Sequence, residues 1–473
     1  MRLRSTRDAS ITASFKDAIL TGLAPDGGLY AIAENPDLSD LFDTFTPETS
    51  FMRIAIDVMG RLVGNEFESI DAAGGLRGIE DVCRAAFSFE PILSDFEDQI
   101  EILELFHGPS CAFKDFGASF LAAAMEYFLG QESRNAVILV ATSGDTGSAV
   151  AQAFKGRAGI DVVILYPKGK VSPLQERQLI SVGGNVRALE VRGTFDDCQR
   201  MVKEAFLDQA LCEALHLTSA NSINIGRLLP QALYYIYAAS RRSEPVRFCV
   251  PCGNLGNLTA GVMAWQWGLR ASGFIAAANA NDVFPQYIRT EVFAPRPSVH
   301  TYSNAMDVGN PSNFERLLAL FGGDHDRMAE LIEGVSVSDE ETLEEIGLVR
   351  SEHDRFVCPH TAVGTLAARR SHGAARRARA GARVDAVSGA AEGTTLTAAP
   401  REVETADNRI GEARIVTLAT AHPAKFGDVI RSATGTEAEP PPQLQGVMDL
   451  PTHSTDVDAT VSALGGILMG WFG

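Results

Sequence analysis

Between residue 99 and about residue 280, short runs of apolar residues alternate with longer stretches whose apolar positions recur at helical spacing. The short runs predict strands over residues 100–105, 136–141, 162–166, 186–191, 246–250 and 274–278. The longer stretches predict helices near residues 117–129, 147–155, 173–181, 195–209, 223–240 and 257–268. Strands and helices that alternate in this way favour right-handed β-α-β units, so we predict an α/β fold with mostly parallel sheets flanked by helices.

The same patterns divide the chain into three predicted domains. Residues 1–95 carry amphipathic patterns with little strand signal, which predicts a mainly helical N-terminal domain. Residues 96–215 form a first α/β lobe, and residues 216–473 form a second, larger one. Within the larger lobe, residues 373–383 are only Gly, Ala and Arg, and the residues that follow are polar and rich in turn formers. We therefore predict that residues 371–412 are a flexible surface insertion.

Charge narrows the classes of partner. The chain of 473 residues has 41 Lys and Arg against 60 Asp and Glu, which gives a formal net charge of −19. Nucleic-acid binding depends on a basic surface, so this balance argues against nucleic acid as the main partner, although it allows a local anion site. A basic cluster does lie in and beside the predicted insertion, where a solvated loop is the simpler interpretation. Its members are Arg369, Arg370, Arg376, Arg377, Arg379 and Arg383.

The cysteines and the apolar segments indicate the cellular compartment in which the protein is expected. Seven cysteines are scattered along the chain, which favours reduced thiols and a cytoplasmic protein. Cys249 and Cys252 form a C-x-x-C motif, but no second pair accompanies it and a Gly-rich turn follows, so a redox or zinc role is disfavoured and we predict no metal site. No stretch approaches the ~20 apolar residues that span a bilayer, and no apolar segment follows the basic N-terminus, so we expect neither a membrane span nor a signal peptide.

Lys114 is the first candidate for chemistry. It follows the strand predicted at residues 100–105 and lies between Phe113 and Phe116, just before a predicted helix. An apolar setting disfavours the charged ammonium and lowers its pKa, which makes the amine nucleophilic, as a lysine that forms a Schiff base requires. The alternative is a lysine whose stem packs on the aromatic rings while its ammonium reaches water.

The loop after the strand at residues 136–141 is a candidate anion site. Ser143, Gly144, Asp145 and Thr146 combine hydroxyl groups, a glycine and a position at the start of a predicted helix. Free N–H groups at a helix N-terminus bind a carboxylate or a phosphate. The alternative is a helix cap, in which Ser or Asp only satisfies the first turn.

A second loop follows the strand at residues 246–250 and opens the next predicted helix. It consists of Gly253, Asn254, Leu255, Gly256 and Asn257. Two glycines let the backbone approach a phosphate closely, and the helix dipole favours its negative charge. No Gly-Lys-Ser/Thr sequence follows, so this is not a Walker A motif, and a single phosphate fits better than a nucleotide.

Polar residues at helical spacing form a third candidate. Asn221, Asn224 and Arg227 recur at i, i+3 and i+6, so they can share one helix end, and Arg offers a planar fork for phosphate or carboxylate. The alternative is a helix cap with a surface arginine. Two further histidines, His360 and His422, lie in turns beside proline, where a structural role is favoured over proton transfer.

Together these segments resemble the threonine synthases of the longer, microbial and fungal form, which are pyridoxal-phosphate enzymes of the tryptophan synthase β fold group. The resemblance covers about residues 1–370 and 413–432 and implies a two-lobed enzyme of pyridoxal-phosphate fold type II. The motifs are G-L-A-P-D-G-G-L-Y at 22–30, F-H-G-P-x-x-A-F-K-D-F at 106–116, S-G-D-T-G-S-A at 143–149, N-S-I-N-x-x-R at 221–227, G-N-x-G-N at 253–257, S-N-F-E-R at 312–316, P-H-T-A-V-G at 359–364 and T-A-H-P-A-K-F at 420–426.

The resemblance implies a role for each candidate residue. Lys114 would hold pyridoxal 5'-phosphate covalently, residues 253–257 would cradle its phosphate, and Thr420 would bond its pyridine nitrogen. Residues 143–146 would hold the substrate carboxylate. Four residues would face the substrate phosphate: Asn221, Ser222, Asn224 and Arg227.

The implied reaction converts O-phospho-L-homoserine and water to L-threonine and phosphate, by γ-elimination followed by β-addition of water. The implied protein is a cytoplasmic monomer or homodimer that acts on a small molecule. Two alternatives stay open. One is a phospho-lyase with the same cofactor that gives a 2-oxo acid and ammonia, which product analysis separates; the other is a non-catalytic relative, against which Lys114 argues.

Overall fold

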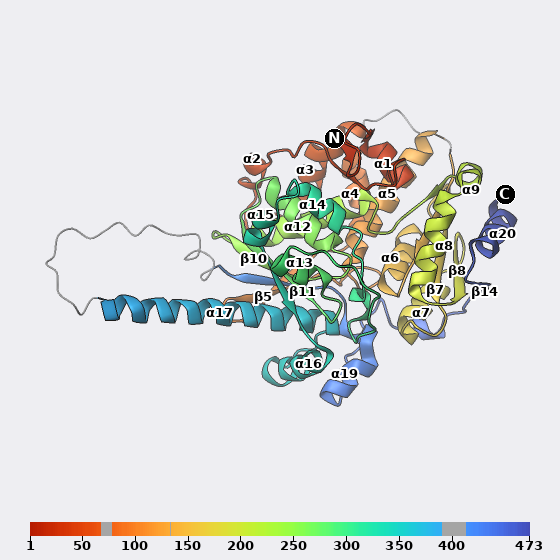
Figure 1. The fold of residues 1–473 in the computed structure, drawn as a ribbon. Helices are drawn as coiled ribbons and strands as arrows, with labels where there is room; N and C mark the ends of the chain where they lie inside the picture. Colours follow the sequence, from red (N-terminus) through yellow and green to blue (C-terminus); the bar gives the residue numbers. More distant parts are fainter. Residues whose placement is uncertain (68–77, 133, 390–412) are drawn as a thin grey trace.

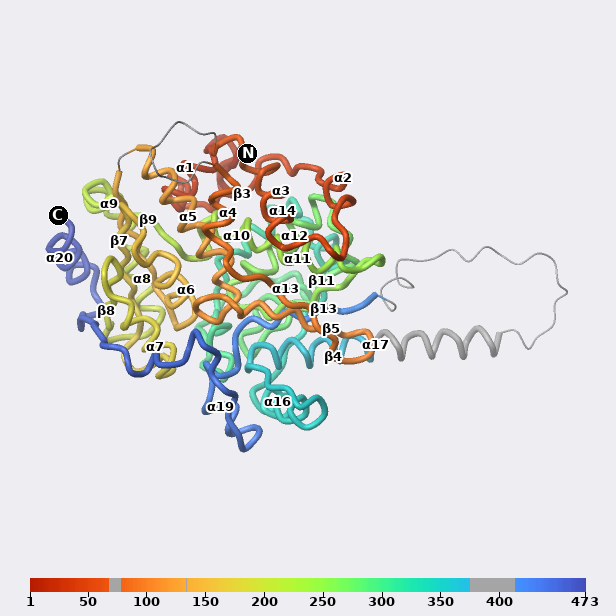
Figure 2. Tube along the Cα trace, turned by 180° about the vertical axis from the view of Figure 1, so that it is seen from behind, coloured from red at the N-terminus to blue at the C-terminus, as the bar shows by residue number. Residues whose placement is uncertain are grey.

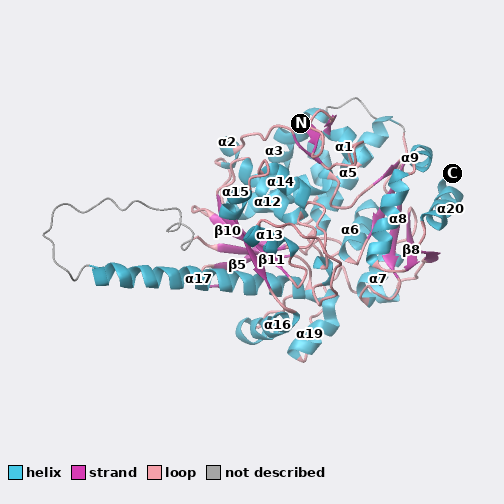
Figure 3. Cartoon of the chain, in the orientation of Figure 1, coloured by secondary structure: helices cyan, strands magenta, loops and turns pink. Residues whose placement is uncertain are grey.

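The computed structural model describes residues 1–67, 78–132, 134–389 and 413–473, with only the backbone described at 375–389. Three sheets organise these residues, one of six strands, one of five and one of three. Strands gather inside each lobe and helices cover them (Figure 1, Figure 3). No helix in the described ranges is both long and apolar enough to cross a membrane.

The six-stranded sheet is the core of the larger lobe. Its strands run in the order β12-β11-β10-β13-β5-β4. All neighbours are parallel except β4, which pairs antiparallel with β5. The bounds are β4 Ile92–Glu97, β5 Ile100–Glu104, β10 Val246–Pro251, β11 Ala271–Ala278, β12 Ile332–Ser336 and β13 Ile415–Ala419.

Helices lie on both faces of this sheet. α16 (Asp339–His353) and α17 (Pro359–Gly389) pack against one face, together with α19 (Gly427–Thr434). The opposite face packs on α11 (Ala232–Ala239) and α12 (Gly256–Gln266), in the same core as α5 (Lys114–Glu132). The remaining helices on this side are α10 Ile225–Leu228, α13 Val283–Thr290, α14 Phe314–Leu320 and α15 His325–Leu331.

The five-stranded sheet forms the smaller lobe and is parallel throughout, in the order β14-β8-β7-β6-β9. All six residues of β6 are buried, as expected for a parallel strand covered on both faces. The strands are β6 Ala136–Ala141, β7 Ile160–Pro167, β8 Val186–Arg192, β9 Leu217–Thr218 and β14 Thr455–Asp458. The helices are α6 Asp145–Phe154, α7 Pro173–Ile180, α8 Phe195–Leu207, α9 Gln209–Leu215 and α20 Val461–Phe472.

The N-terminal segment contains a small sheet that the sequence pattern did not predict. Strands β1 (Arg2–Ser5), β2 (Thr12–Ser14) and β3 (Tyr30–Ile32) pair antiparallel in the order β2-β1-β3. These strands are too short for their alternation to stand out from the surrounding turns. The segment's helices are α1 Phe15–Thr21, α2 Ser39–Phe42, α3 Phe51–Val63 and α4 Ile79–Ala86.

The six predicted strands and the predicted parallel α/β class are confirmed, but strand pairing departs from the predicted boundary near residue 95. β5 belongs to the larger sheet rather than the smaller one, and β14 returns from the C-terminal segment to the edge of the smaller sheet (Figure 2). The helix predicted at 223–240 is divided where Pro230 lies in a 3-10 turn. The order of the strands in the sequence does not reveal that β5 and β14 belong to the sheet of the other lobe, because each pairs with strands far away in the sequence.

The prediction of a flexible insertion at residues 371–412 is wrong for its first part. α17 continues through Gly389, so residues 371–389 are helical, and the helix extends outward from the lobe (Figure 1). Alanine and arginine are strong helix formers, which explains why the Gly-Ala-Arg segment continues the helix rather than breaking it. The remainder, 390–412, lies outside the described residues.

Candidate active site

Lys114 is the first residue of α5 and follows the loop that leaves β5 at the carboxyl end of the larger sheet. Its side chain is largely buried, with 15% exposed. The ammonium nitrogen lies 4.6 Å from the centre of the Phe113 ring. Burial, opposed by nearby Asp145, lowers the pKa of Lys114 to about 8, so a substantial fraction of the amine is neutral near that pH.

Four strand ends converge on the cavity that Lys114 lines. The loop after β6 contributes Ser143, Asp145 and Thr146, and the loop after β10 contributes residues 253–257. Thr420 follows β13, and the segment before α10 adds further polar residues. Ligands of α/β proteins bind at these carboxyl ends. Segments that are far apart in the sequence are thus brought to one place.

The loop at residues 253–257 is closely covered by another segment. A Cβ atom at Gly253 would lie 2.9 Å from Cα of Met306 and 3.1 Å from the carbonyl oxygen of Ala305. Leu255 has a φ of 60°, a left-handed conformation that is unfavourable for a residue with a side chain. The loop then enters α12, whose first N–H groups have no acceptor within the helix. The side chain of Leu255 packs in the core, and strained backbone of this kind is frequent at ligand-binding sites.

Asn257 is buried in the first turn of α12. Its Oδ1 atom accepts hydrogen bonds from the hydroxyls of Tyr234 at 2.5 Å and Tyr235 at 2.7 Å. Its Nδ2 atom is buried and has no acceptor among the described residues. Asn254 lies on the same loop and donates from Nδ2 to the Ser222 hydroxyl at 2.7 Å. The loop therefore keeps a buried donor available beside a helix N-terminus.

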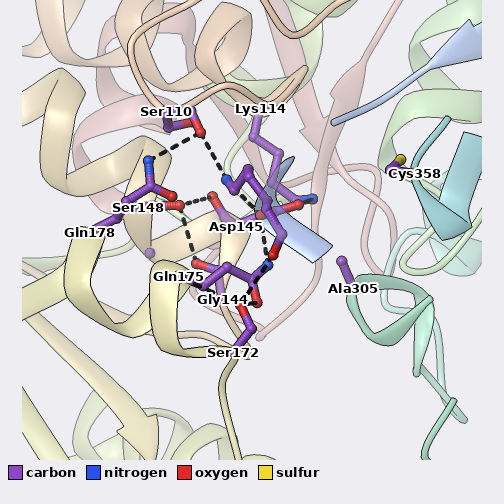
Figure 4. A network of polar contacts seen from close by, with 12 residues as sticks. Ser110, Lys114, Gly144, Asp145, Ser148, Ser172, Gln175, Gln178, Ala305 and Cys358 are labelled. Atoms are coloured by element: carbon purple, nitrogen blue, oxygen red, sulfur yellow. Dashed lines mark hydrogen bonds and ion pairs between the residues drawn. The ribbon is translucent and has the colours of Figure 1, made fainter. Parts of the chain in front are cut away.

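The side chain of Asp145 does not face an anion; it faces cations. Its carboxylate lies 2.7 Å from Nζ of Lys425 and 3.9 Å from Nζ of Lys114. The Nε2 atom of Gln175 donates to it at 2.8 Å (Figure 4). Burial opposes ionisation, but the positive charges of Lys425 and Lys114 hold the pKa of Asp145 well below its usual range. A carboxylate in this setting is a counterion, so only the backbone and hydroxyls of this loop can meet an anion.

The segment from residue 221 into α10 contains residues that line the cavity and one that does not. Asn221, Ser222 and Arg227 line it, and two buried atoms, Oδ1 of Asn221 and Nε of Arg227, have no hydrogen-bond partner among the described residues. Asn224 is occupied elsewhere: its Nδ2 atom donates to the carbonyl oxygens of Ile19 and Ser219, both at 2.9 Å. Helical spacing grouped these residues, but Asn224 caps α10 instead.

Known proteins resemble this chain over its whole length. The family model described as "Pyridoxal-phosphate dependent enzyme" matches residues 102–421, and models for the threonine synthase N terminus and C-terminal part match residues 2–74 and 395–467. Threonine synthase of Escherichia coli is 35% identical over 99% of both chains. Threonine synthase of Buchnera aphidicola is 35% identical over 98% of both. The chain belongs to the threonine synthase family.

Solved structures of the family agree in fold. The crystal structure of threonine synthase from Escherichia coli has a TM-score of 0.83 at 34% identity and covers 100% of both chains. The structure of pyridoxal-phosphate-bound threonine synthase from Brucella melitensis has a TM-score of 0.82 at 32% identity, over 100% of this chain and 99% of that one. The fold is therefore pyridoxal-phosphate fold type II, as the resemblance implied.

The residues present fit the family's cofactor. Pyridoxal phosphate needs an amine, a phosphate cradle and a neighbour for its ring. Lys114 supplies a buried amine, and the glycine loop with the α12 N-terminus and the free Nδ2 atom of Asn257 supplies the cradle. Thr420, 5% exposed, lines the same cavity. The fit rests on donors that no residue of the described chain satisfies.

Two residues that line the cavity, His360 and Met306, and one buried residue behind its wall, Lys425, were not predicted as site residues. Lys425 is fully buried and reaches Asp145 from beyond β13. His360 lines the cavity, where burial lowers its pKa to about 4 and its Nε2 atom accepts from the N–H of Ala305 at 3.1 Å. Met306 closes over Gly253. The T-A-H-P-A-K-F and P-H-T-A-V-G motifs marked two of them, but nothing in either motif names the partner.

Other singled-out residues are structural. The Cys249 and Cys252 thiols are buried, and burial raises the pKa of each, which disfavours the thiolate that metal or redox chemistry needs. His422 caps a 3-10 turn by accepting the N–H of Ala424. Arg369 and Arg370 of the basic cluster form ion pairs with carboxylates. The side chains of the other four arginines in the cluster lie outside the described residues.

Proposed function

We propose that this chain converts O-phospho-L-homoserine and water to L-threonine and phosphate, with pyridoxal 5'-phosphate held on Lys114. The observation that carries the proposal is the convergence of a buried Lys114, a glycine loop with an unpaired Asn257 donor and an unpaired Arg227 donor on one cavity. The full-length likeness to threonine synthases supports the same reaction.

Pyridoxal phosphate, when bound, supplies the electron sink for carbanions next to the substrate amine. Lys114 has two tasks in this scheme. It holds the cofactor, and after the substrate amine has taken its place, its free Nζ atom moves protons at Cα and Cβ of the substrate. A pKa lowered to about 8 suits a group that must both accept and donate a proton near neutral pH.

The phosphate and the carboxylate of the substrate are assigned to different residues. Among the described residues, Arg227 keeps an unpaired Nε donor on one wall, and we assign the substrate phosphate to this wall, which Asn221 and Ser222 also line. The carboxylate is assigned to the loop at residues 143–146, through the hydroxyls and the N–H groups that open α6. The N–H groups of Gly144 and Gly147 already donate to the Thr142 hydroxyl, at 3.0 and 2.8 Å, so we assign the carboxylate to the N–H groups of Asp145 and Thr146.

Water must be controlled at this cavity, because it is also a substrate. The cavity lies between the lobes, and its wall includes Met306 and His360 of the larger lobe. His360 is kept neutral, because burial lowers its pKa to about 4 and its Nε2 atom is occupied by the N–H of Ala305. We assign it to holding the Asn304–Met306 turn over the glycine loop.

The test is product identification. Purified protein supplied with O-phospho-L-homoserine and pyridoxal phosphate should release phosphate and give L-threonine by mass spectrometry. Lys114→Ala should give neither threonine nor the visible absorbance of lysine-bound cofactor. Lys168→Ala is the matched control, because Lys168 is a half-exposed lysine paired with Glu190 and Asp456.

Three outcomes would contradict the proposal. A 2-oxo acid and ammonia in place of threonine would indicate a phospho-lyase. No reaction of a protein that binds the cofactor would indicate a non-catalytic relative. Full activity of Lys114→Ala would remove Lys114 from its assigned role.

A further inference from the structure

Lys425 connects the two segments on which the cavity depends. Its side chain is fully buried, at 0% exposed, in the turn that follows β13 of the larger lobe. Its Nζ atom donates to the carbonyl oxygen of Ser110 at 2.8 Å, in the loop that leads to Lys114. The same atom lies 2.7 Å from the Asp145 carboxylate at the start of α6 in the smaller lobe.

A fully buried lysine is rare unless it is paired, so this placement requires a reason. The pairing also has a competitor. Lys114 lies on the other oxygen of the same carboxylate, at 3.9 Å, beyond the distance of a direct hydrogen bond. Asp145 thus has two cations nearby. Its close partner is Lys425, which has no part in the proposed reaction, and Lys114 lies farther away.

We propose that Lys425 is a positioning residue that occupies the Asp145 carboxylate and thereby keeps the Lys114 amine free to bind the cofactor. The role of Lys425 in the reaction rests on the proposed function. The ion pair between Lys425 and Asp145 is present in the protein itself and does not depend on that function. Without Lys425, Asp145 would have Lys114 as its remaining close cation. The attraction would then hold the lysine as an ammonium, which is not a nucleophile.

Surrounding contacts keep Asp145 in this arrangement. Gln175 donates to the carboxylate oxygen that faces Lys425, and Ser172 donates to the side-chain oxygen of Gln175 at 2.9 Å (Figure 4). A Cβ atom at Gly144 would lie 2.7 Å from the Gln175 amide, so the glycine gives that amide its room. The carboxylate is therefore held from the smaller lobe while Lys425 meets it from the larger one.

The charges around the two lysines set the sign of the expected effect. Burial lowers the pKa of Lys114, the negative charge of Asp145 raises it, and the positive charges of Lys425 and Arg227 lower it further. Other titratable groups that face this cluster are Cys358 toward Lys114, His360 toward Asp145, and Asp115, Cys111 and His422 toward Lys425. Removing Lys425 takes away a positive charge and strengthens the hold of Asp145 on Lys114, so both effects raise the pKa of Lys114.

The experiment follows cofactor loading rather than catalysis. Full-length protein freed of cofactor is mixed with pyridoxal 5'-phosphate, and the rate at which the visible absorbance of lysine-bound cofactor appears is measured from pH 6 to 10. For the wild type, the midpoint of the rate against pH should lie at pH about 8. For Lys425→Met, it should move up by about one unit, which slows loading about tenfold at pH 7.

Two further variants keep the test valid if Lys425→Met does not fold, because that variant leaves a buried carboxylate with one partner fewer. Asp145→Asn should move the midpoint below that of the wild type. In the double variant Asp145→Asn with Lys425→Met, removing Lys425 should move the midpoint up by less than it does in the wild type, because no carboxylate remains to hold Lys114. Lys168→Met is the matched control, and its midpoint should equal that of the wild type.

The inference is overturned if Lys425→Met loads with the wild-type midpoint, or if removing Lys425 shifts the midpoint as much in the Asp145→Asn variant as in the wild type. A merely structural role for Lys425 would lower the amount of folded protein without moving these midpoints. The result is also separable from the proposed function. If the midpoints shift as expected but the protein makes no threonine, the inference about Lys425 is supported and the proposed reaction is contradicted.

Discussion

Gly253→Ala tests whether the tight contact between the glycine loop and the Asn304–Met306 turn requires a glycine at position 253. The new Cβ atom would lie 2.9 Å from Cα of Met306 and 3.1 Å from the carbonyl oxygen of Ala305, both of which are backbone atoms. Carbon atoms in favourable contact lie about 3.5–4.0 Å apart, so either the loop or the turn at Asn304–Met306 must move by roughly 0.6–1 Å. His360 holds that turn through the N–H of Ala305, which limits its movement.

Overpacking of this kind costs about 1–3 kcal/mol. If the free protein relaxes by moving the loop, the cost reappears when the cofactor requires the original loop, and its dissociation constant should rise between about fivefold and about 150-fold. If the loop cannot relax, the same free energy appears as lost stability. The two losses together should reach about 1–3 kcal/mol.

Two measurements separate these routes. Titration with pyridoxal phosphate, followed by visible absorbance, gives the affinity, and urea unfolding without cofactor gives the free energy of unfolding. Gly427→Ala is the matched control, because a Cβ atom at Gly427 would meet nothing within 4 Å. Gly253→Ala with wild-type affinity and wild-type stability would refute the argument that the covering is tight.

Three other predictions follow from single contacts. Arg227→Gln removes a charged donor from the wall assigned to the substrate phosphate, so KM in steady-state assays should rise roughly 10- to 100-fold with a smaller change in kcat; an unchanged KM would contradict this. Arg242→Met leaves the buried Glu101 with only a longer contact of 3.9 Å to Arg414, and urea unfolding should show a loss of about 3 kcal/mol, whereas no loss would refute the reasoning. Burial raises the pKa of Asp307 to about 6, so its contribution to stability is present below pH 4 and is lost as pH rises through 6. Asp307→Asn should therefore lose less stability than the wild type between pH 4.5 and 7, and equal losses in urea unfolding would contradict this.

Elements of the fold could be predicted where the hydrophobic pattern of a single segment is sufficient to identify a strand or a helix. The six residues of β6 are all apolar and all buried, so periodicity and length were sufficient. The strands β1, β2 and β3 were missed because three or four residues give too little periodicity, and only their mutual pairing reveals them. α17 was not predicted, because its Gly-Ala-Arg segment has the composition of a flexible insertion, although alanine and arginine are strong helix formers.

The candidate site shows the same division. Lys114 and the glycine loop could be placed because each directly follows a predicted strand, and parallel strands bring their carboxyl ends together. Asn224 met the spacing criterion, yet its amide bonds Ile19, a partner that no local pattern identifies. The loop of Asp145 predicts an anion site because it combines hydroxyl groups and a glycine at the start of a helix, whereas the carboxylate of Asp145 itself contacts Lys425. The direction of a single side chain depends on tertiary neighbours, which the sequence of one loop does not contain.

The position of β13 between β10 and β5 has a consequence for how the protein is made. The bond from Lys425 to Ser110 joins residues 315 positions apart, and β13 emerges from the ribosome after the other five strands of the larger sheet. Loop-closure entropy must be overcome before such distant contacts can stabilise the sheet, so assembly of this lobe is slow and late. A nascent chain holds the unpaired edges of β5 and β10 open during synthesis of the intervening segment, which is when aggregation and chaperone capture compete with folding. The cofactor pocket is therefore one of the last parts of the molecule to exist.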